Sequence, residues 1–252
     1  MKTIILSAGR GSRLQGLTAE RPKCLLDISG RSLLEWQVRA LEAAGVAEIV
    51  VVTGFGASHV EDALQAMERG GVAPGTRIRT LHNPFFALAD NLGSCWAARG
   101  EMTGAFAILN GDTLIEPKLA EAVFAGEPAF PITVTIDRKN GYDPDDMKVS
   151  LDGNRLLAIG KALAPEIVHG ESIGFLRFSP EGGRLFASRV EAIMKTEAGL
   201  KLWYLSAIDR IAREKGDVGV RSIEGLEWGE LDFPEDLDRN RAMAAAWTTR
   251  GL

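Results

Sequence analysis

Apolar residues in the first half of the chain occur either in short continuous runs or at helical spacing. Continuous runs rich in β-branched residues are typical of strands buried on both faces. They predict strands over residues 2–7, 48–53 and 105–109, with a shorter one over 77–81. Helical spacing predicts helices over 32–44 and 58–67, with another that begins near Asn91. Strands and helices that alternate in this way predict parallel strands joined by right-handed crossovers.

The pattern changes at about residue 131, where short strands follow one another with hairpin-like connections. They are expected over 132–136, 148–151, 156–159 and 172–178, and helices over 180–194, 202–215 and 234–247. No low-complexity tract, repeat or charge block separates the two halves. We therefore expect one α/β domain over 1–252, in which the halves 1–130 and 131–252 share one sheet. The predicted fold is a three-layer α/β/α, Rossmann-like fold with a mixed, mostly parallel central sheet.

The composition argues against several classes of protein, including nucleic-acid binders and membrane proteins. A chain of 252 residues with a net charge of −5 can bury a large core but lacks the basic surface usual in nucleic-acid binders. No apolar run approaches the roughly 18 residues that span a bilayer, and Met1 leads directly into a predicted strand. Cys24 and Cys95 show no metal-type spacing. We expect a cytoplasmic protein without nucleic-acid or membrane partners, and a homodimer is compatible with the pattern.

The segment LSAGRGSRLQGLTAERPKCLL, residues 6–26, follows the first predicted strand and combines glycines with basic side chains. Glycine lets backbone N–H groups approach and wrap a phosphate. Arg13 offers a forked donor and Lys23 a point charge for the same anion. The segment therefore predicts a cradle for a triphosphate. The residues expected to wrap the phosphates are Ala8, Gly9, Gly11 and Ser12.

Two better-known phosphate loops are excluded. The P-loop needs G-x-x-x-x-G-K-[ST], which the chain does not contain. The dinucleotide fingerprint needs G-x-G-x-x-G/A, but Leu14 stands where the third small residue would permit close packing of helix on strand. A nicotinamide or flavin cofactor is therefore not expected.

The arrangement G-x-G-x-R-L followed by P-K resembles the signature of the sugar-phosphate nucleotidylyltransferase superfamily, and the similarity extends through most of the chain. The resemblance implies a nucleotidyltransferase fold with Mg²⁺ as cofactor. It places one metal-binding carboxylate at Asp112, in the sequence NGD, and the second at Asp232, in ELDFP. Arg13 and Lys23 would contact the nucleotide's phosphates and stabilise the charge that develops on them during transfer.

Both aspartates also have simpler interpretations. Gly-Asp-Thr is favourable turn chemistry, so Asp112 can be a turn residue or helix cap, and Asp232 can cap the helix that begins at Pro234. As metal ligands they suit Mg²⁺, which prefers a few carboxylates together with phosphates and water. Asp112 and the glycine turn both follow predicted strands, so we expect them at the same edge of the sheet. Glu230 is a weaker third candidate.

Three further segments resemble the smaller cytidylyltransferases, which activate phosphocholine, 2-aminoethylphosphonate and related molecules. They are NPFFALADNLGSCW from residue 83, DDMKV from 145 and WGELDFPEDL from 228. This resemblance implies transfer of CMP from CTP to a phosphorylated small molecule with release of pyrophosphate. Two alternatives remain open: a sugar-1-phosphate enzyme that uses UTP, dTTP or GTP, and a non-catalytic nucleotide sensor on the same fold.

Two residues are candidates for reading the base. Asn91 and Ser94 lie where the resembling enzymes place residues that contact the base and the acceptor. An Asn amide offers both a donor and an acceptor, which is enough to read a pyrimidine edge. The alternative is that Asn91 belongs to a plain helix cap, and the sequence does not decide between the two.

The half 131–252 is interpreted as the acceptor-binding half. Lys148 or Lys161 would pair with the acceptor's phosphate, and Glu171 with a cationic or hydroxyl group, although each alone is more often a solvated charge. Trp203 is a candidate wall of an aromatic cage for a quaternary amine. A tryptophan on a helix more commonly serves the core, so this role is an alternative.

Overall fold

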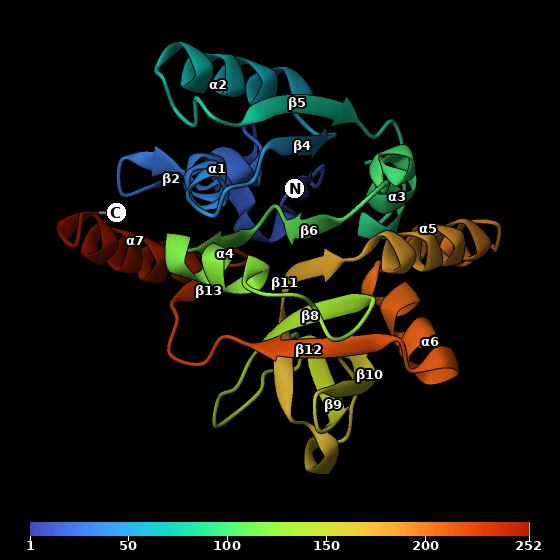
Figure 1. Ribbon diagram of the computed structural model, residues 1–252. Coiled ribbons are helices and arrows are strands. Elements are labelled where there is room, and N and C mark those ends of the chain that lie inside the picture. The colour runs from blue at the N-terminus through green and yellow to red at the C-terminus, as the bar shows by residue number, and fades with distance from the viewer. Residues whose placement is uncertain (252) are drawn as a thin grey trace.

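The computed structural model describes residues 1–251, apart from the side chain of Gln15. The first half of the chain contributes four strands to the main sheet: β1 (Lys2–Ser7), β4 (Glu48–Thr53), β5 (Arg77–His82) and β6 (Phe106–Asn110). The second half contributes β8 (Ile132–Asp137), β9 (Lys148–Asp152), β10 (Arg155–Gly160), β11 (Gly170–Phe178) and β12 (Val218–Ser222). They form one nine-stranded sheet in the order β5-β4-β1-β6-β11-β8-β12-β10-β9 (Figure 1).

The first four strands are parallel, because β1 pairs with β4 and β6, and β4 pairs with β5. Beyond β6, strand β11 is antiparallel to both β6 and β8, while β12 is parallel to β8. Within the nine-stranded sheet, β10 and β11 run against the other strands. The predicted mixed, mostly parallel sheet is therefore confirmed, and both halves of the chain belong to it.

Helices cover both faces of this sheet (Figure 1). One face packs against α1 (Leu33–Ala43), α2 (Ala57–Arg69) and α4 (Pro117–Phe124). The other packs against α3 (Asn91–Ala97), α5 (Pro180–Met194) and α6 (Leu205–Lys215). Ile4 and Ile5 are both fully buried, yet they enter opposite cores because adjacent strand residues point to opposite faces. The three-layer α/β/α fold is confirmed.

The last helix, α7 (Pro234–Thr249), packs beside α1. The rings of Trp36 and Trp247 meet edge to face with centroids 5.6 Å apart, and both side chains are buried. Two small sheets complete the fold: β2 (Asp27–Ile28) pairs with β3 (Arg31–Ser32), and β7 (Thr113–Ile115) pairs with β13 (Trp228–Glu230). The second small sheet ties the chain just after β6 to the chain just before α7.

Local sequence explains where several helices begin. The hydroxyl oxygens of Ser32 and Ser179 each accept a hydrogen bond of 3.1 Å, from the backbone N–H of Glu35 and of Gly182 respectively. These contacts satisfy donors at the starts of α1 and α5 that have no partner within the helix. Proline occupies the first position of α4, α5 and α7, where no N–H is needed.

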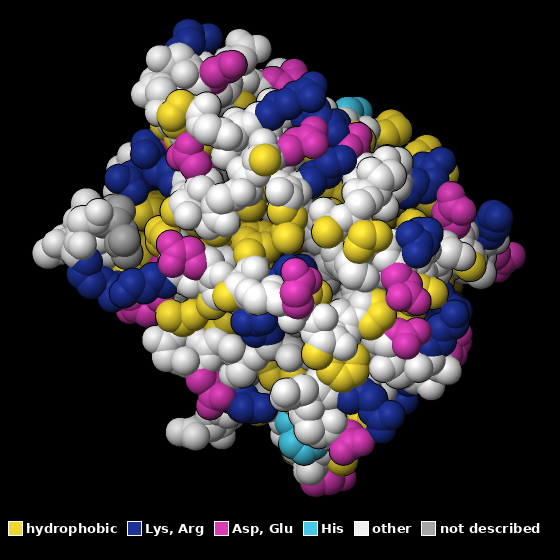
Figure 2. All heavy atoms as spheres, in the orientation of Figure 1, with side chains coloured by type: hydrophobic (Ala, Val, Ile, Leu, Met, Phe, Trp, Pro, Cys, Tyr) yellow, Lys and Arg dark blue, Asp and Glu magenta, His cyan; other side chains and the backbone are white. Residues whose placement is uncertain are grey.

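The sequence pattern missed α4, β2, β3, β7, β12 and β13 and placed the start of α6 at residue 202 instead of Leu205. The two paired strands β7 and β13 have three residues each, which is too short for an alternation to be recognised. None of the described helices is long and apolar enough to cross a membrane. On the face drawn in Figure 2, basic and acidic side chains are interspersed.

Candidate functional site

The glycine turn after β1 forms one wall of a cavity of about 200 Å³ at the carboxyl edge of the sheet. Gly11 has a φ of +71°, which favours glycine, and a Cβ there would lie 3.0 Å from the Cβ of Lys23. The hydroxyl of Thr18 donates to the Gly11 carbonyl oxygen at 2.8 Å. The turn therefore lies directly against the lysine. Of the predicted turn residues, Ser12 lies outside the lining, and those that line the cavity are Ala8, Gly9 and Gly11.

Asp112 and Asp232 lie side by side although they are far apart in sequence. Asp112 stands between β6 and β7, and Asp232 follows β13. In the small β7–β13 sheet Thr113 pairs with Glu230, and the N–H of Leu231 donates to the Asp112 carbonyl oxygen at 3.0 Å. This pairing, which the sequence pattern did not predict, brings the two carboxylates together.

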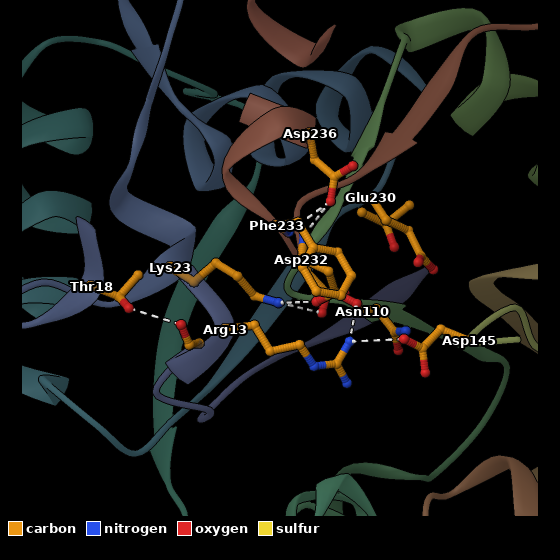
Figure 3. Close-up of polar contacts among 12 residues, drawn as sticks. Arg13, Thr18, Lys23, Asn110, Asp145, Glu230, Asp232, Phe233 and Asp236 are labelled. Atoms are coloured by element: carbon orange, nitrogen blue, oxygen red, sulfur yellow. Dashed lines mark hydrogen bonds and ion pairs between the residues drawn. The ribbon is translucent and has the colours of Figure 1, made fainter. Parts of the chain in front are cut away.

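One ammonium group joins these two carboxylates, and Figure 3 shows it with Asp232 and Arg13. The Nζ of Lys23 lies 2.8 Å from Oδ2 of Asp112 and 2.9 Å from Oδ1 of Asp232, and Arg13 donates to the other oxygen of Asp232 at 3.0 Å. Burial opposes the charge on Lys23, but the two carboxylates outweigh it and hold the pKa of the lysine above its usual value. Burial likewise opposes the charge on Asp232, yet Lys23 and Arg13 keep its pKa below the usual value.

A third carboxylate stands close to this pair. Desolvation, followed by repulsion from Asp112 and Asp232, raises the pKa of Glu230 above its usual value. Within residues 1–251, no cluster of three or more His, Cys, Asp or Glu side chains has the geometry of a metal centre. Two carboxylates that already converge on one cation do fit Mg²⁺, which completes its shell with phosphate and water oxygens.

The cavity extends from the glycine turn to α3, where both predicted base-reading residues line it. The side-chain oxygen of Asn91 accepts a hydrogen bond from the N–H of Tyr204 at 2.8 Å, so its NH₂ group and the second lone pair of that oxygen can serve a ligand. Ser94 accepts from the amide of Asn83 at 3.1 Å and keeps its hydroxyl hydrogen for donation. The side chain of Asp90, rather than that of Asn91, caps α3.

On the other side of Asp232 lies a groove of about 600 Å³, in which acidic side chains outnumber basic ones. Glu171 is buried in its wall, with 5% of its side chain exposed, and pairs with the Nζ of Lys139 at 2.9 Å. The same ammonium lies 2.8 Å from Asp146 and 5.7 Å from the ring centroid of Tyr142. An ammonium group thus already sits among two carboxylates and an aromatic ring.

The buried carboxyl group of Glu171 gives the first testable prediction. Burial raises its pKa from 4.5 to about 7. Because the folded protein binds this proton more tightly than the unfolded chain, its contribution to stability is complete below about pH 4.5 and is lost as the pH rises through about 7. The loss amounts to about 3 kcal/mol of unfolding free energy. In Glu171→Gln this loss should disappear. Urea unfolding at pH 5 and pH 8 measures it, and equal pH dependence in both proteins would contradict the prediction.

Lys148 contacts backbone carbonyl groups and lies outside the lining of the groove. Its side chain is buried, and its Nζ donates to the carbonyl oxygens of Asp143 at 2.6 Å and Lys161 at 3.0 Å. Those of Pro144 and Asp146 are 3.4 Å away. The ammonium therefore binds the backbone of the turn over residues 143–147 and the carbonyl oxygen of Lys161. The predicted pairing of Lys148 with an acceptor phosphate has no support in this geometry.

Lys161 and Trp203 reach the edge of the site through Asp145. The Nζ of Lys161 lies 3.0 Å from Oδ1 of Asp145 and 4.6 Å from the ring centroid of Trp203. Asp145 also lies 3.9 Å from Arg13 and so joins the two halves of the chain. Trp203 precedes α6, is 37% exposed and is not a core residue. The sequence pattern did not predict the ion pairs of Lys139, Asp145 and Asp146, because charged residues in an irregular loop show no periodicity.

The chain is similar to known proteins both in its sequence and in its fold. The model of the family described as the MobA-like NTP transferase domain matches residues 3–223. The CMP-5'-(3-aminopropyl)phosphonate synthase of Streptomyces rubellomurinus is 29% identical over 94% of this chain, which spans only 37% of that protein. The N-acetylmuramate alpha-1-phosphate uridylyltransferase of Neisseria meningitidis serogroup B is 31% identical, over 98% of this chain and 100% of that protein. The structure of the inositol-1-phosphate CTP transferase from T. maritima superimposes with a TM-score of 0.79 at 20% identity, covering 96% of this chain and 94% of that one.

Proposed function

This chain belongs to the MobA-like NTP transferase domain family, and we propose that it transfers CMP from CTP to a phosphorylated small molecule with release of pyrophosphate. The observation that carries this proposal is the convergence of Asp112 and Asp232 on the ammonium of Lys23, beside the cavity lined by the glycine turn. This arrangement would supply phosphate contacts and a carboxylate pair of the kind that phosphoryl chemistry with a divalent ion needs.

In the proposed reaction an oxygen of the acceptor's phosphate attacks the α-phosphorus of CTP in line. A new P–O bond forms, the bond to the β-phosphate oxygen breaks, and pyrophosphate leaves with that electron pair. Arg13 and Lys23 would bind the phosphates and reduce the repulsion between the two anions. Mg²⁺ held by Asp112 and Asp232 would neutralise further charge. No protein nucleophile is required, so the contribution of the chain is positioning and electrostatics.

The groove beside Asp232 supports an acceptor that carries a positive charge away from its phosphate. Its acidic lining and the aromatic side chains of Trp228 and Phe233 would favour an ammonium group over a neutral sugar. Glu171 and Asp146 already bind the ammonium of Lys139. The name of the Streptomyces relative contains such an acceptor, an aminopropylphosphonate. We therefore favour phosphocholine or an aminoalkylphosphonate.

A panel of nucleotides and acceptors tests the proposal. CTP, UTP, dTTP and GTP are each combined with phosphocholine, 2-aminoethylphosphonate and a hexose 1-phosphate, and pyrophosphate release is measured with Mg²⁺. We expect turnover with CTP and a cationic acceptor. The second candidate, a sugar-1-phosphate enzyme, is favoured by the 31% identity to the Neisseria uridylyltransferase. Turnover confined to UTP with the hexose phosphate would replace the first proposal by the second.

Lys148 gives a prediction about the acceptor side. Because its ammonium holds the turn that carries Asp145 and Asp146, Lys148→Met should loosen that wall of the groove. We expect KM for the acceptor to rise about tenfold, the equivalent of one lost charged hydrogen bond. KM for CTP should change far less, since the turn does not line the nucleotide cavity.

Steady-state kinetics with each substrate varied in turn measures this effect. Lys118→Met, the same change at an exposed position of α4, is the control. An equal rise in both KM values would indicate a general loss of structure and contradict the specific role of Lys148.

A further inference from the structure

The ammonium of Lys23 contacts the two carboxylates that the proposed function assigns to the metal. Its Nζ lies 2.8 Å from Asp112 and 2.9 Å from Asp232, and 15% of the lysine side chain is exposed. Mg²⁺ held by the same carboxylates would need oxygen contacts of about 2.1 Å. The lysine cation and a divalent ion compete for these carboxylates, because the lysine already binds one oxygen of each aspartate and the two positive charges repel.

We propose that Lys23 is an internal counter-ion that keeps the divalent metal out of the nucleotide-free protein and releases the aspartates only when a triphosphate binds. The inference rests on the proposed function, because it takes Asp112 and Asp232 as the metal ligands. It adds a binding rule: metal and nucleotide enter together, and each raises the affinity for the other through this one side chain.

The position of the lysine stem makes the exchange of partners feasible. The Cβ of Lys23 lies only 3.0 Å from the point where a Cβ on Gly11 would stand, so the stem runs along the glycine turn. Phosphates bound by that turn would offer new acceptors within reach of a flexible four-carbon chain carrying a compact charge. The change needs only rotation of the side chain.

Neighbouring charges explain why each ligand alone binds poorly. When Lys23 leaves, Arg13 still contacts Asp232, but Asp112 loses the one ion-pair partner that the described residues give it. A nucleotide that drew the lysine away without a metal would leave the carboxylates of Asp112 and Asp232 facing its own phosphates. A metal without nucleotide would have to displace the lysine with no anion to receive it.

Metal binding to the protein alone tests the proposal, with Mn²⁺ as the probe and paramagnetic resonance of free Mn²⁺ as the readout. Wild type and Lys23→Met are titrated with and without α,β-methylene-CTP, which cannot be cleaved at the reacting bond. Without nucleotide, we expect Lys23→Met to bind Mn²⁺ about tenfold more tightly than wild type, since a competing charged contact has been removed. The gain in Mn²⁺ affinity caused by the analogue should be smaller in the variant than in wild type.

Two controls locate the effect. Lys118→Met should bind Mn²⁺ as wild type does, and adding Asp112→Asn to Lys23→Met should abolish the extra affinity. Equal Mn²⁺ affinity of wild type and Lys23→Met without nucleotide would overturn the proposal, as would extra affinity that survives Asp112→Asn. If Lys23→Met does not fold, Lys23→Gln provides the same comparison. The titration uses no acceptor, so a failure of CMP transfer in the substrate panel would be recognised separately.

Discussion

Replacing Asp112 with asparagine is expected to lower kcat for CMP transfer by about 10³-fold, equivalent to about 4 kcal/mol of transition-state stabilisation. Asparagine keeps the shape of the side chain but removes the negative charge that a divalent ion requires. In the proposed reaction the loss would fall on kcat, because the metal would stabilise charge that develops as pyrophosphate leaves. Initial rates of pyrophosphate release at saturating CTP, acceptor and Mg²⁺ measure the effect. Asp232→Asn should lower kcat by a similar factor, since both aspartates converge on the ammonium of Lys23.

The control is Asp62→Asn, the same change at an exposed position of α2, which should leave the rate unchanged. Thermal unfolding of the Asp112 variant shows whether it remains folded. A folded Asp112→Asn protein that keeps a tenth or more of the wild-type kcat would exclude the proposed metal role of Asp112.

Gly111→Ala is expected to lower both the stability and the activity of the protein. A Cβ on Gly111 would lie 2.4 Å from the carbonyl oxygen of Leu6, 2.4 Å from Oγ of Ser7 and 2.9 Å from its Cα. Two of these atoms belong to the backbone of β1 in the centre of the sheet, so they cannot move aside easily. We expect the free energy of unfolding to fall by about 3 kcal/mol and Tm by about 10 °C.

The same displacement would move the neighbouring Asp112, and a misplacement of about 1 Å at a reacting centre costs about 100-fold in rate. Gly100→Ala is the matched control, because a Cβ there would have no neighbour within 4 Å. Calorimetry and initial rates below the Tm of the variant separate the two effects. A Gly111→Ala protein with wild-type Tm would show that the approach of β6 to β1 is looser than the structure indicates.

Both halves of the chain contribute charged side chains to the cluster around Arg13. Arg13 comes from the glycine turn, yet its guanidinium lies near Asp145 and Asp232, which both belong to the second half. The reacting centre is therefore expected at the junction of the halves. We expect a substitution in one half to change the binding of the substrate held by the other half mainly through the contact between Arg13 and Asp145.

Much of the scaffold follows from short-range sequence. The run EIVVVT is a strand because its β-branched apolar side chains are buried in the centre of a parallel sheet. Helix α1 begins after Ser32 because the serine hydroxyl satisfies the N–H of Glu35. The glycine turn with Arg13 and Lys23 was recognised because its residue types and spacing occur within one short segment. The fold class and the family resemblance are both confirmed.

The sequence by itself therefore determined the layers of the fold, the glycine turn with its two basic residues and the two acidic positions, since each depends on residues close together in the chain or on a motif. Only the tertiary structure decided which groups meet. Strands β7 and β13 are too short to be seen in a pattern, yet their pairing brings Asp112 to Asp232. Lys148 binds carbonyl oxygens and Lys23 contacts both aspartates, and the sequence pattern predicted neither contact. A charged side chain takes whichever partner folding brings within about 3 Å, and that distance is set by contacts between distant segments.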